Sequence, residues 1–278
     1  MPSTYGLWRS DALPGIELQT AVNPGITCRL IQTTHAFCVI PHTDNPDADL
    51  ATWRYRGHDH VYRPRMVGME EPGEVHANTA VRVPTSFWLL LVDPAVFAAA
   101  SDELERPSAH FAVAHSQHPE LYDAFARFYS AARAGSDDLE LQTRLAACLR
   151  GALTIGGEGA RARTAPALTP AGLRRAIAYL REHFMGPVQL DVLARVASVS
   201  KYHLARQFTA ACGMPPHAYQ TQLRLAAARQ QLRAGVPLGS VESGFFDVSH
   251  LTRHLKRSWC ITPGQYLQPS AAALPDWH

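Results

Sequence analysis

The side chains with the clearest chemistry lie in the C-terminal half, where two short amphipathic segments flank a tight turn. Residues 190–200 have the pattern of a helix followed by a turn, and Ser200 is placed to cap a second helix. The apolar stripe expected to be buried on that second helix consists of Leu204, Phe208 and Ala211. The opposite face carries Lys201, Tyr202, Ala205, Arg206 and Thr209. Such a face is suited to contact phosphates and the edges of nucleic acid bases.

A similar pattern recurs about 49 residues further along the chain. Leu251 and Leu255 repeat the apolar spacing of the first unit, and Arg253 takes the position of Arg206. The helical segment 218–233 between them predicts a spacer that holds two reading helices apart. Two such helices about one turn of DNA apart, roughly 34 Å, could enter successive major grooves.

The net charge differs between the two halves of the chain. Residues 1–160 hold 12 Arg and no Lys against 19 Asp and Glu, a net −7, whereas residues 161–278 hold 14 Lys and Arg against 5 Asp and Glu, a net +9. The basic half is typical of a polyanion binder, because each phosphate contact releases a condensed counterion. On charge alone, membranes and acidic proteins are alternative partners.

Further motif residues extend the pattern over about ninety residues, from about Ala176 to Tyr266. They are Leu193-Ala194, Ser200, Leu204, Arg206, Phe208, Cys212–His217, Tyr219, Arg224, Ala228-Arg229, Leu232, Gly244-Phe245, Asp247, Ser249–Leu251, Arg253, Leu255–Arg257 and Thr262–Tyr266. In this order and register they resemble the tandem helix-turn-helix domain of the AraC/XylS family of bacterial transcription regulators. The resemblance implies double-stranded promoter DNA as a partner, a homodimer, and contact with RNA polymerase.

The residues expected to meet DNA lie on the two reading helices. For base contact we expect Tyr202, Ala205 and Arg206, and the resemblance adds Ser249, His250 and Arg253. For phosphate contact we expect Lys201, Lys256 and Arg257.

One departure from the family pattern precedes the second unit. The stretch 241–245 is two residues shorter than usual ahead of its Gly-Phe, and Val248 stands where glutamine is usual. Two residues correspond to about 200° of helix rotation, so the first helix of this unit cannot match the family's unchanged. We therefore predict that the first unit performs most of the base reading.

The N-terminal half has the pattern of a β-rich domain. Short β-type runs between residues 24 and 93, broken by turn formers, predict a small antiparallel barrel. Two amphipathic helices, 119–133 and 138–155, follow as a hairpin, and their stripes are more often core than subunit interface. We predict an α+β two-domain chain: a barrel domain over 1–155, a linker over 156–169 and an all-α domain with two helix-turn-helix units over 170–278.

The barrel is the expected site of a small-molecule effector. Residues 52–57 and 71–76 are similar to the cupin-like effector domains often fused to this DNA-binding domain. Barrel mouths are frequent ligand sites, although core packing competes as an interpretation for each aromatic residue. The candidates for an apolar wall and an anion clamp are Trp53, Arg54, Tyr55, Arg56, His76 and Trp88.

The same region permits a metal site as an alternative. His58 and His60, with Glu70, Glu71 or Glu74 and then His76, resemble the His/His/Glu/His set of catalytic cupins, and these ligand types suit a divalent transition metal. Their spacing departs from that pattern, so we expect no cofactor and no enzymatic activity. A cupin-type metal-dependent oxygenase carrying a DNA-binding domain is the alternative function.

The remaining sequence features favour a reduced, cytoplasmic environment. The five cysteines are scattered and form no C-x-x-C pair. The longest apolar stretch, Phe87–Val92, is far shorter than the roughly 20 residues of a membrane helix, and no secretory signal is visible. We expect a cytoplasmic one-component transcription regulator with no membrane partner, whose DNA binding is modulated by the effector.

Overall fold

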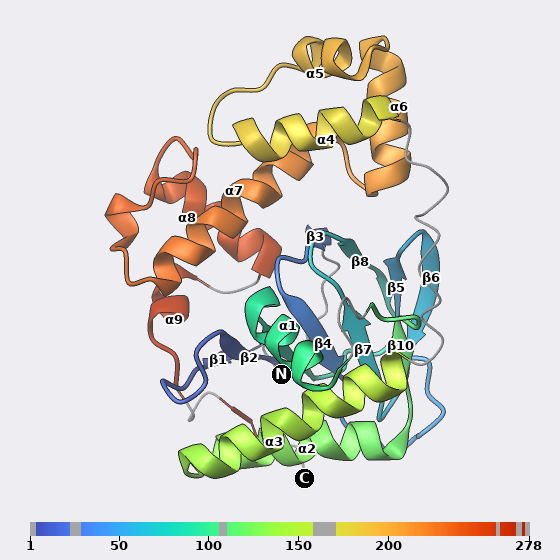
Figure 1. Ribbon diagram of the computed structural model, residues 1–278, viewed down its shortest axis with the longest axis vertical. Coiled ribbons are helices and arrows are strands. Elements are labelled where there is room, and N and C mark those ends of the chain that lie inside the picture. The colour runs from blue at the N-terminus through green and yellow to red at the C-terminus, as the bar shows by residue number, and fades with distance from the viewer. Residues whose placement is uncertain are drawn as a thin grey trace. The chain divides into compact units, whose positions relative to one another are not determined.

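The computed structural model describes residues 4–22, 29–105, 110–157, 171–259, 262–270 and 274–275. The chain forms two compact units: Met1–Ala162 together with Gln268–His278, and Arg163–Leu267 (Figure 1). Antiparallel sheets fill the first unit and helices fill the second, which confirms the α+β two-domain prediction. Residues 158–170 contain most of the predicted linker and lie outside the described residues.

Two antiparallel sheets form the body of the first unit. The six-stranded sheet has, in order, β1 (Thr4–Trp8), β2 (Ile16–Val22), β9 (Phe87–Val92), β4 (His35–Val39), β7 (Val67–Glu70) and β10 (His115–Ser116). The four-stranded sheet has, in order, β3 (Arg29–Ile31), β8 (Val75–Val81), β5 (Ala51–Tyr55) and β6 (His58–Tyr62). The sequence patterns do not predict β1, β2 or β10, and they predict only 81–83 where β8 forms.

The six-stranded sheet is buried on both faces. Phe37 and Leu90 point to the helical side and pack with α2 (Pro119–Ala134) and α3 (Asp138–Gly151). Cys38 and Leu89, one residue away, belong to the cluster that includes residues of the four-stranded sheet. Because side chains alternate along a strand, a strand covered on both faces needs apolar residues at nearly every position. This explains the continuous apolar run of β9.

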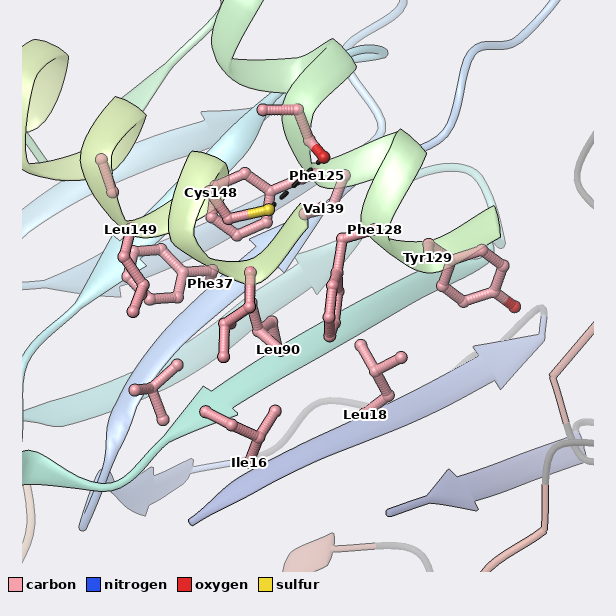
Figure 2. Close-up of a cluster of buried hydrophobic side chains, with 14 of the residues drawn as sticks. Ile16, Leu18, Phe37, Val39, Leu90, Phe125, Phe128, Tyr129, Cys148 and Leu149 are labelled. Carbon is pink, nitrogen blue, oxygen red and sulfur yellow. Dashed lines mark hydrogen bonds between the residues drawn. The ribbon is translucent and has the colours of Figure 1, made fainter. Parts of the chain in front are cut away.

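The helical hairpin closes the outer face of that sheet (Figure 2). Both predicted stripes are buried against the sheet, which confirms the intramolecular interpretation: Leu121, Phe125, Phe128, Leu141, Leu145, Leu149 and Leu153. The Cys148 thiol donates to the Ala124 carbonyl oxygen over 3.4 Å and joins the two helices. A π-helical turn, Ala152–Gly156, ends the hairpin, and α1 (Pro94–Glu103) also packs on α3. Each fully buried side chain of this kind stabilises the fold by about 1.5–3 kcal/mol.

The end of the chain returns to the first unit. Leu274 is 4% exposed and lies in the same apolar cluster as Trp8. The Ser270 amide donates to the Leu7 carbonyl oxygen over 2.8 Å, and the Tyr129 hydroxyl donates to the Pro275 carbonyl oxygen over 2.9 Å. The all-α unit therefore ends at Leu267, whereas the sequence-based boundary carried it to residue 278.

The second unit is built around one long helix, α7 (Pro216–Arg233). The helices that precede it are α4 (Ala171–His183), α5 (Leu190–Ala197) and α6 (Lys201–Cys212). Those that follow are α8 (Val248–Trp259) and α9 (Pro263–Leu267). α7 contacts α4 and α6 as well as α8 and α9, so it connects two groups of helices as predicted (Figure 1).

The scaffold of the second group is reduced. The sequence predicts a helix over 238–243, but only the 3-10 turn Leu238–Ser240 forms there. Residues 241–247 between this turn and α8 are not helical. The predicted helix is therefore wrong, and the departure of this unit from the family pattern stays a prediction.

Candidate functional site

A short turn orients α6 relative to α5. Ser198 ends α5 in the left-handed conformation with φ of 60°, and the Ser200 side chain accepts from the His203 amide over 3.3 Å, which confirms the predicted cap. Arg175 on α4 donates to the Val196 carbonyl oxygen over 2.9 Å, at the C-terminus of α5. A cation at this helix end is favourable because the last carbonyls have no intrahelical partner.

α6 presents the predicted polar face to solvent. Leu204 and Phe208 are fully buried, while Lys201 and Arg206 are exposed and Ala205 is half-buried. The predicted apolar stripe is wrong at Ala211, which is exposed because it lies in the last turn of the helix, beyond the packed face. Tyr202 is 79% exposed. A large aromatic ring so exposed is available to a partner.

α8 repeats this division of faces. Leu251 and Leu255 are buried, and His250 is half-buried. The exposed predicted contacts are Ser249, Arg253, Lys256 and Arg257. The structure thus places every predicted DNA contact on α6 or α8, and which of them meet bases and which meet phosphates stays a prediction.

Most of these cations have no acidic partner among the described residues: Arg206, Arg253, Lys256 and Arg257. Lys201 Nζ lies 3.7 Å from Asp191 Oδ1, and both side chains are largely exposed. An ion pair of this kind contributes little and is easily exchanged for another anion. The positive charge of α6 and α8 is therefore available to phosphates.

The sequence patterns do not predict the exposure of Phe246 or the contacts of Arg224 in this unit. Phe246, in the loop before α8, is 93% exposed, and the only signal for it was its place beside the Gly-Phe motif. Arg224 on α7 donates to the Phe184 carbonyl oxygen over 2.7 Å and to that of Gly186 over 2.8 Å. These bonds fix the loop after α4 on α7, and a Cβ on Gly244 would collide with the Met185 carbonyl oxygen in this loop.

In the first unit, Glu71 is the centre of a buried polar network. Its Oε1 forms an ion pair with Arg56 Nη2, 2.8 Å away, and its carboxylate accepts from the Phe111 amide over 2.7 Å and from His110 Nδ1 over 2.9 Å. Burial favours a higher pKa for Glu71, but Arg56, His110 and the Phe111 amide outweigh it and hold the pKa below its ordinary value. Arg56 also pairs with Glu74 over 2.7 Å. The Arg56 guanidinium is thus occupied by carboxylates, contrary to its expected role as an anion clamp.

The structure brings together part of the predicted effector pocket. Trp53, Tyr55 and His76 lie side by side, and the Trp53 ring is 5.4 Å from that of Tyr55 and 5.3 Å from that of His76. Trp88 lies on the helix-facing side of its sheet, where its ring is 5.0 Å from that of Tyr129. Arg54 is exposed on the strand that carries Trp53. Trp88 and Arg54 therefore do not line the same space as Trp53.

Two buried ring nitrogens in this cluster have no hydrogen-bond partner among the described residues: Trp53 Nε1 and His60 Nε2. The Trp53 side chain is fully buried and its ring is 4.8 Å from that of His60. Burial lowers the pKa of His60 and keeps its imidazole neutral. An unpaired buried donor costs about 1–3 kcal/mol, which a bound acceptor would recover.

The residues of the alternative metal site do not converge. Glu74 pairs with Arg56, and His76 lies 2.7 Å from Glu70 through Nδ1 and 3.0 Å from Asn78 through Nε2. His58 is exposed. In the described part of the chain, no group of three or more His, Cys, Asp or Glu side chains is arranged to hold a metal ion.

Comparison with known proteins assigns the helical unit. Residues 193–269 match the protein family described as "Helix-turn-helix domain". The C-terminal unit carries an AraC-type helix-turn-helix domain. Relatives of the AraC-type domain include the "Uncharacterized HTH-type transcriptional regulator YbfI" of Bacillus subtilis, 38% identical over 75 residues that cover 26% of this chain and 27% of that protein.

Two further relatives match over part of the chain. The "HTH-type transcriptional activator RhaS" of Enterobacter sp. is 32% identical over 107 residues, 37% of this chain and 38% of that protein. The "Regulatory protein ada" of Salmonella typhimurium is 33% identical over 98 residues, 33% of this chain and 28% of that protein. The matches therefore span between about a quarter and two fifths of the length of these relatives.

A solved structure is similar over nearly the whole chain. It is that of unsaturated fatty acid bound ToxT from Vibrio cholerae, with a TM-score of 0.52, 9% sequence identity, and coverage of 95% of this chain and 94% of ToxT. At this identity the likeness shows the fold alone. In this fold a β-rich N-terminal unit is followed by an AraC-type domain. Among the described helices, none is long and apolar enough to cross a membrane.

Proposed function

We propose that this chain is a one-component transcription regulator that binds promoter DNA sequence-specifically through its AraC-type domain. The observation that carries the proposal is the pair of helices α6 and α8, whose buried stripes leave Arg206 and Arg253 exposed without acidic partners among the described residues. Exposed arginines on such helices suit guanine edges and phosphates.

Selection of genomic DNA fragments tests this proposal. The purified full chain is mixed with fragmented genomic DNA at near-physiological salt and again at higher salt, and the retained DNA is sequenced. Enriched sites with a regular half-site spacing are the expected result. Retention without enrichment that is abolished by salt would contradict sequence-specific binding, because backbone contacts alone depend on counterion release.

We further propose that an effector binds in the Trp53 cluster of the first unit and changes the DNA affinity of the AraC-type domain. The unpaired Trp53 Nε1 calls for an acceptor, and the partly buried Phe87 and Leu89 supply an apolar wall. These features suit a mainly apolar molecule with one polar acceptor group. ToxT, which has the same fold, was solved with an unsaturated fatty acid, so carboxylic acids with apolar chains are the first class to test.

Thermal unfolding with a panel of such acids tests effector binding, since a ligand of the native state raises the melting temperature. Trp53→Phe is the test variant, because it keeps an aromatic side chain and removes the N–H donor together with part of the ring. The expected result is a stabilising acid whose effect is reduced in Trp53→Phe. An equal effect in both proteins would place the ligand elsewhere.

The proposal also includes a homodimer as the DNA-binding form and contact with RNA polymerase at the promoter. Light scattering of the purified chain in the concentration range of DNA binding measures the first, and a dimer mass is expected. Transcription in a purified system measures the second, where the chain is expected to change promoter output only when its DNA site is present.

A further inference from the structure

α8 carries two histidines whose ring nitrogens converge. His250 and His254 are four residues apart, and their Nε2 atoms lie 3.1 Å from each other. Both side chains are half-buried, so solvent reaches them. Two neutral imidazoles that meet in this way share a single hydrogen bond, in which one ring donates and the other accepts. The same pair of nitrogens can instead be bridged by one metal ion.

The separation of the two nitrogens fits metal coordination. Two histidines at positions i and i+4 are the spacing with which a helix presents two ligands to zinc. With Zn–N bonds of about 2.0–2.1 Å, ligand nitrogens roughly 2.9 Å apart subtend about 90° at the ion, and those roughly 3.3 Å apart subtend about 109°. The observed 3.1 Å lies between these values.

The aromatic ring of Phe245 packs beside both histidines and holds them in place. The Phe245 ring is 5.3 Å from that of His250 and 5.4 Å from that of His254.

The nearby positive charge limits which cation can bind. Arg253 and Arg257 repel any cation at this position, so ions held mainly by charge, such as Mg²⁺ and Ca²⁺, are disfavoured. Ions that form strong bonds to imidazole, such as Cu²⁺, Ni²⁺ and Zn²⁺, are favoured.

We propose that His250 and His254 form a two-imidazole site for a divalent transition metal ion on α8, with water completing the coordination. An ion at this position occupies His250, so it competes with DNA for that side chain. This second part rests on the proposed function, in which α8 faces DNA.

Titration of the full chain with Ni²⁺ or Zn²⁺ by calorimetry tests the site. The variants are His254→Gln, which removes one ligand, and His217→Gln as a matched control. His217 is exposed on α7, and the positions one turn away are Gly213 and Thr221, so it lacks a second imidazole. We expect one bound equivalent in the unchanged chain and in His217→Gln, and at least tenfold weaker binding at that site in His254→Gln. Equal affinity and stoichiometry in all three proteins would overturn the site.

A Cu²⁺ electron paramagnetic resonance spectrum gives an independent readout. In the unchanged chain we expect the copper spectrum to show coupling to two nitrogens. In His254→Gln this coupling should be lost while the melting temperature is retained, which separates removal of the ligand from misfolding. Unaltered nitrogen coupling in that variant would overturn the assignment.

DNA titration tests the competition with a fragment recovered by the genomic selection. At saturating metal, the dissociation constant is expected to rise at least fivefold for the unchanged chain and to stay constant for His254→Gln. A constant value for the unchanged chain would overturn the competition. The metal titrations use no DNA, so they decide the site even where sequence-specific DNA binding fails.

Discussion

Arg56 and Glu71 form an ion pair inside the first unit, with Nη2 and Oε1 2.8 Å apart and both side chains largely buried. Each has further partners, Glu74 for Arg56 and the Phe111 amide for Glu71. This pair connects the turn after β5 with the segment that follows β7, so it fixes one end of the four-stranded sheet.

Loss of one partner leaves the other charge buried and unpaired. Arg56→Met is therefore expected to lower the free energy of unfolding by about 3 kcal/mol, measured by urea denaturation of the full chain. Arg54→Met is the control, because Arg54 is exposed and lies 3.8 Å from an equally exposed Asp59. Its expected cost is below about 0.5 kcal/mol, and equal losses in both variants would contradict a structural role for the pair.

His35 predicts a loss of stability in mild acid. Burial lowers the pKa of His35 to about 4 from an unfolded value of 6.5. Between these pH values the His35 side chain binds a proton in the unfolded chain but not in the folded chain. The free energy of unfolding that neutral His35 contributes above pH 6.5 is therefore lost as the pH falls toward 4. The melting temperature of His35→Leu should fall less over this range than that of the unchanged chain. The exposed His58→Leu variant should keep the full dependence, and parallel curves for His35→Leu would refute the assignment.

The two reading helices are expected to contribute unequally. Arg206→Ala should weaken binding to a selected DNA site by about 1–3 kcal/mol and relax its specificity. Arg253→Ala should cost less, because the helix that would support α8 is reduced to a 3-10 turn. Fluorescence anisotropy with the selected site and with single-base variants measures both. Equal losses of affinity and specificity would show that both helices read bases.

Gly244 and Gly235 form a natural comparison. Both have positive φ, 77° and 81°, but a Cβ on Gly235 meets nothing within 4 Å, whereas one on Gly244 would lie 2.8 Å from Arg224 Nε and collide with the Met185 carbonyl oxygen. Gly235→Ala should cost about 1 kcal/mol from backbone strain alone. Gly244→Ala should cost about 3 kcal/mol, because the overpacked contact adds to the same strain. Thermal unfolding distinguishes the two, and equal shifts would mean that the loop simply moves aside.

The helical unit is predictable from sequence because its signals are local. The apolar spacing of Leu204 and Phe208 and the cap at Ser200 each fall within one helix, and the structure reproduces both. Ala211 fails because periodicity alone does not say where a packed face ends. Phe246 was missed because its exposure depends on how the loop before α8 lies on α7.

The first unit is harder to predict because its decisive contacts join distant segments. Trp53 and Trp88 are both predicted to line the effector pocket, yet they lie in different apolar clusters on separate sheets. The charged Glu17 weakens the strand pattern of β2. In the structure Glu17 is buried because it is paired with Arg9, 2.9 Å away, on the neighbouring segment. The carboxylate partners of Arg56 lie up to 18 residues away in sequence, so no local pattern indicates that its guanidinium is already paired.

Residues 268–270 and 274–275 belong to the first unit, so that unit can be completed only after they have been synthesised. The sheets and the α2–α3 hairpin leave the ribosome well before Leu274, whose side chain fills part of their apolar cluster. The helical unit is one continuous stretch of chain. All its residues are synthesised before Leu274, although this unit follows most of the first unit in the sequence. The first unit, although most of it is translated first, can therefore be completed only after the helical unit has been synthesised.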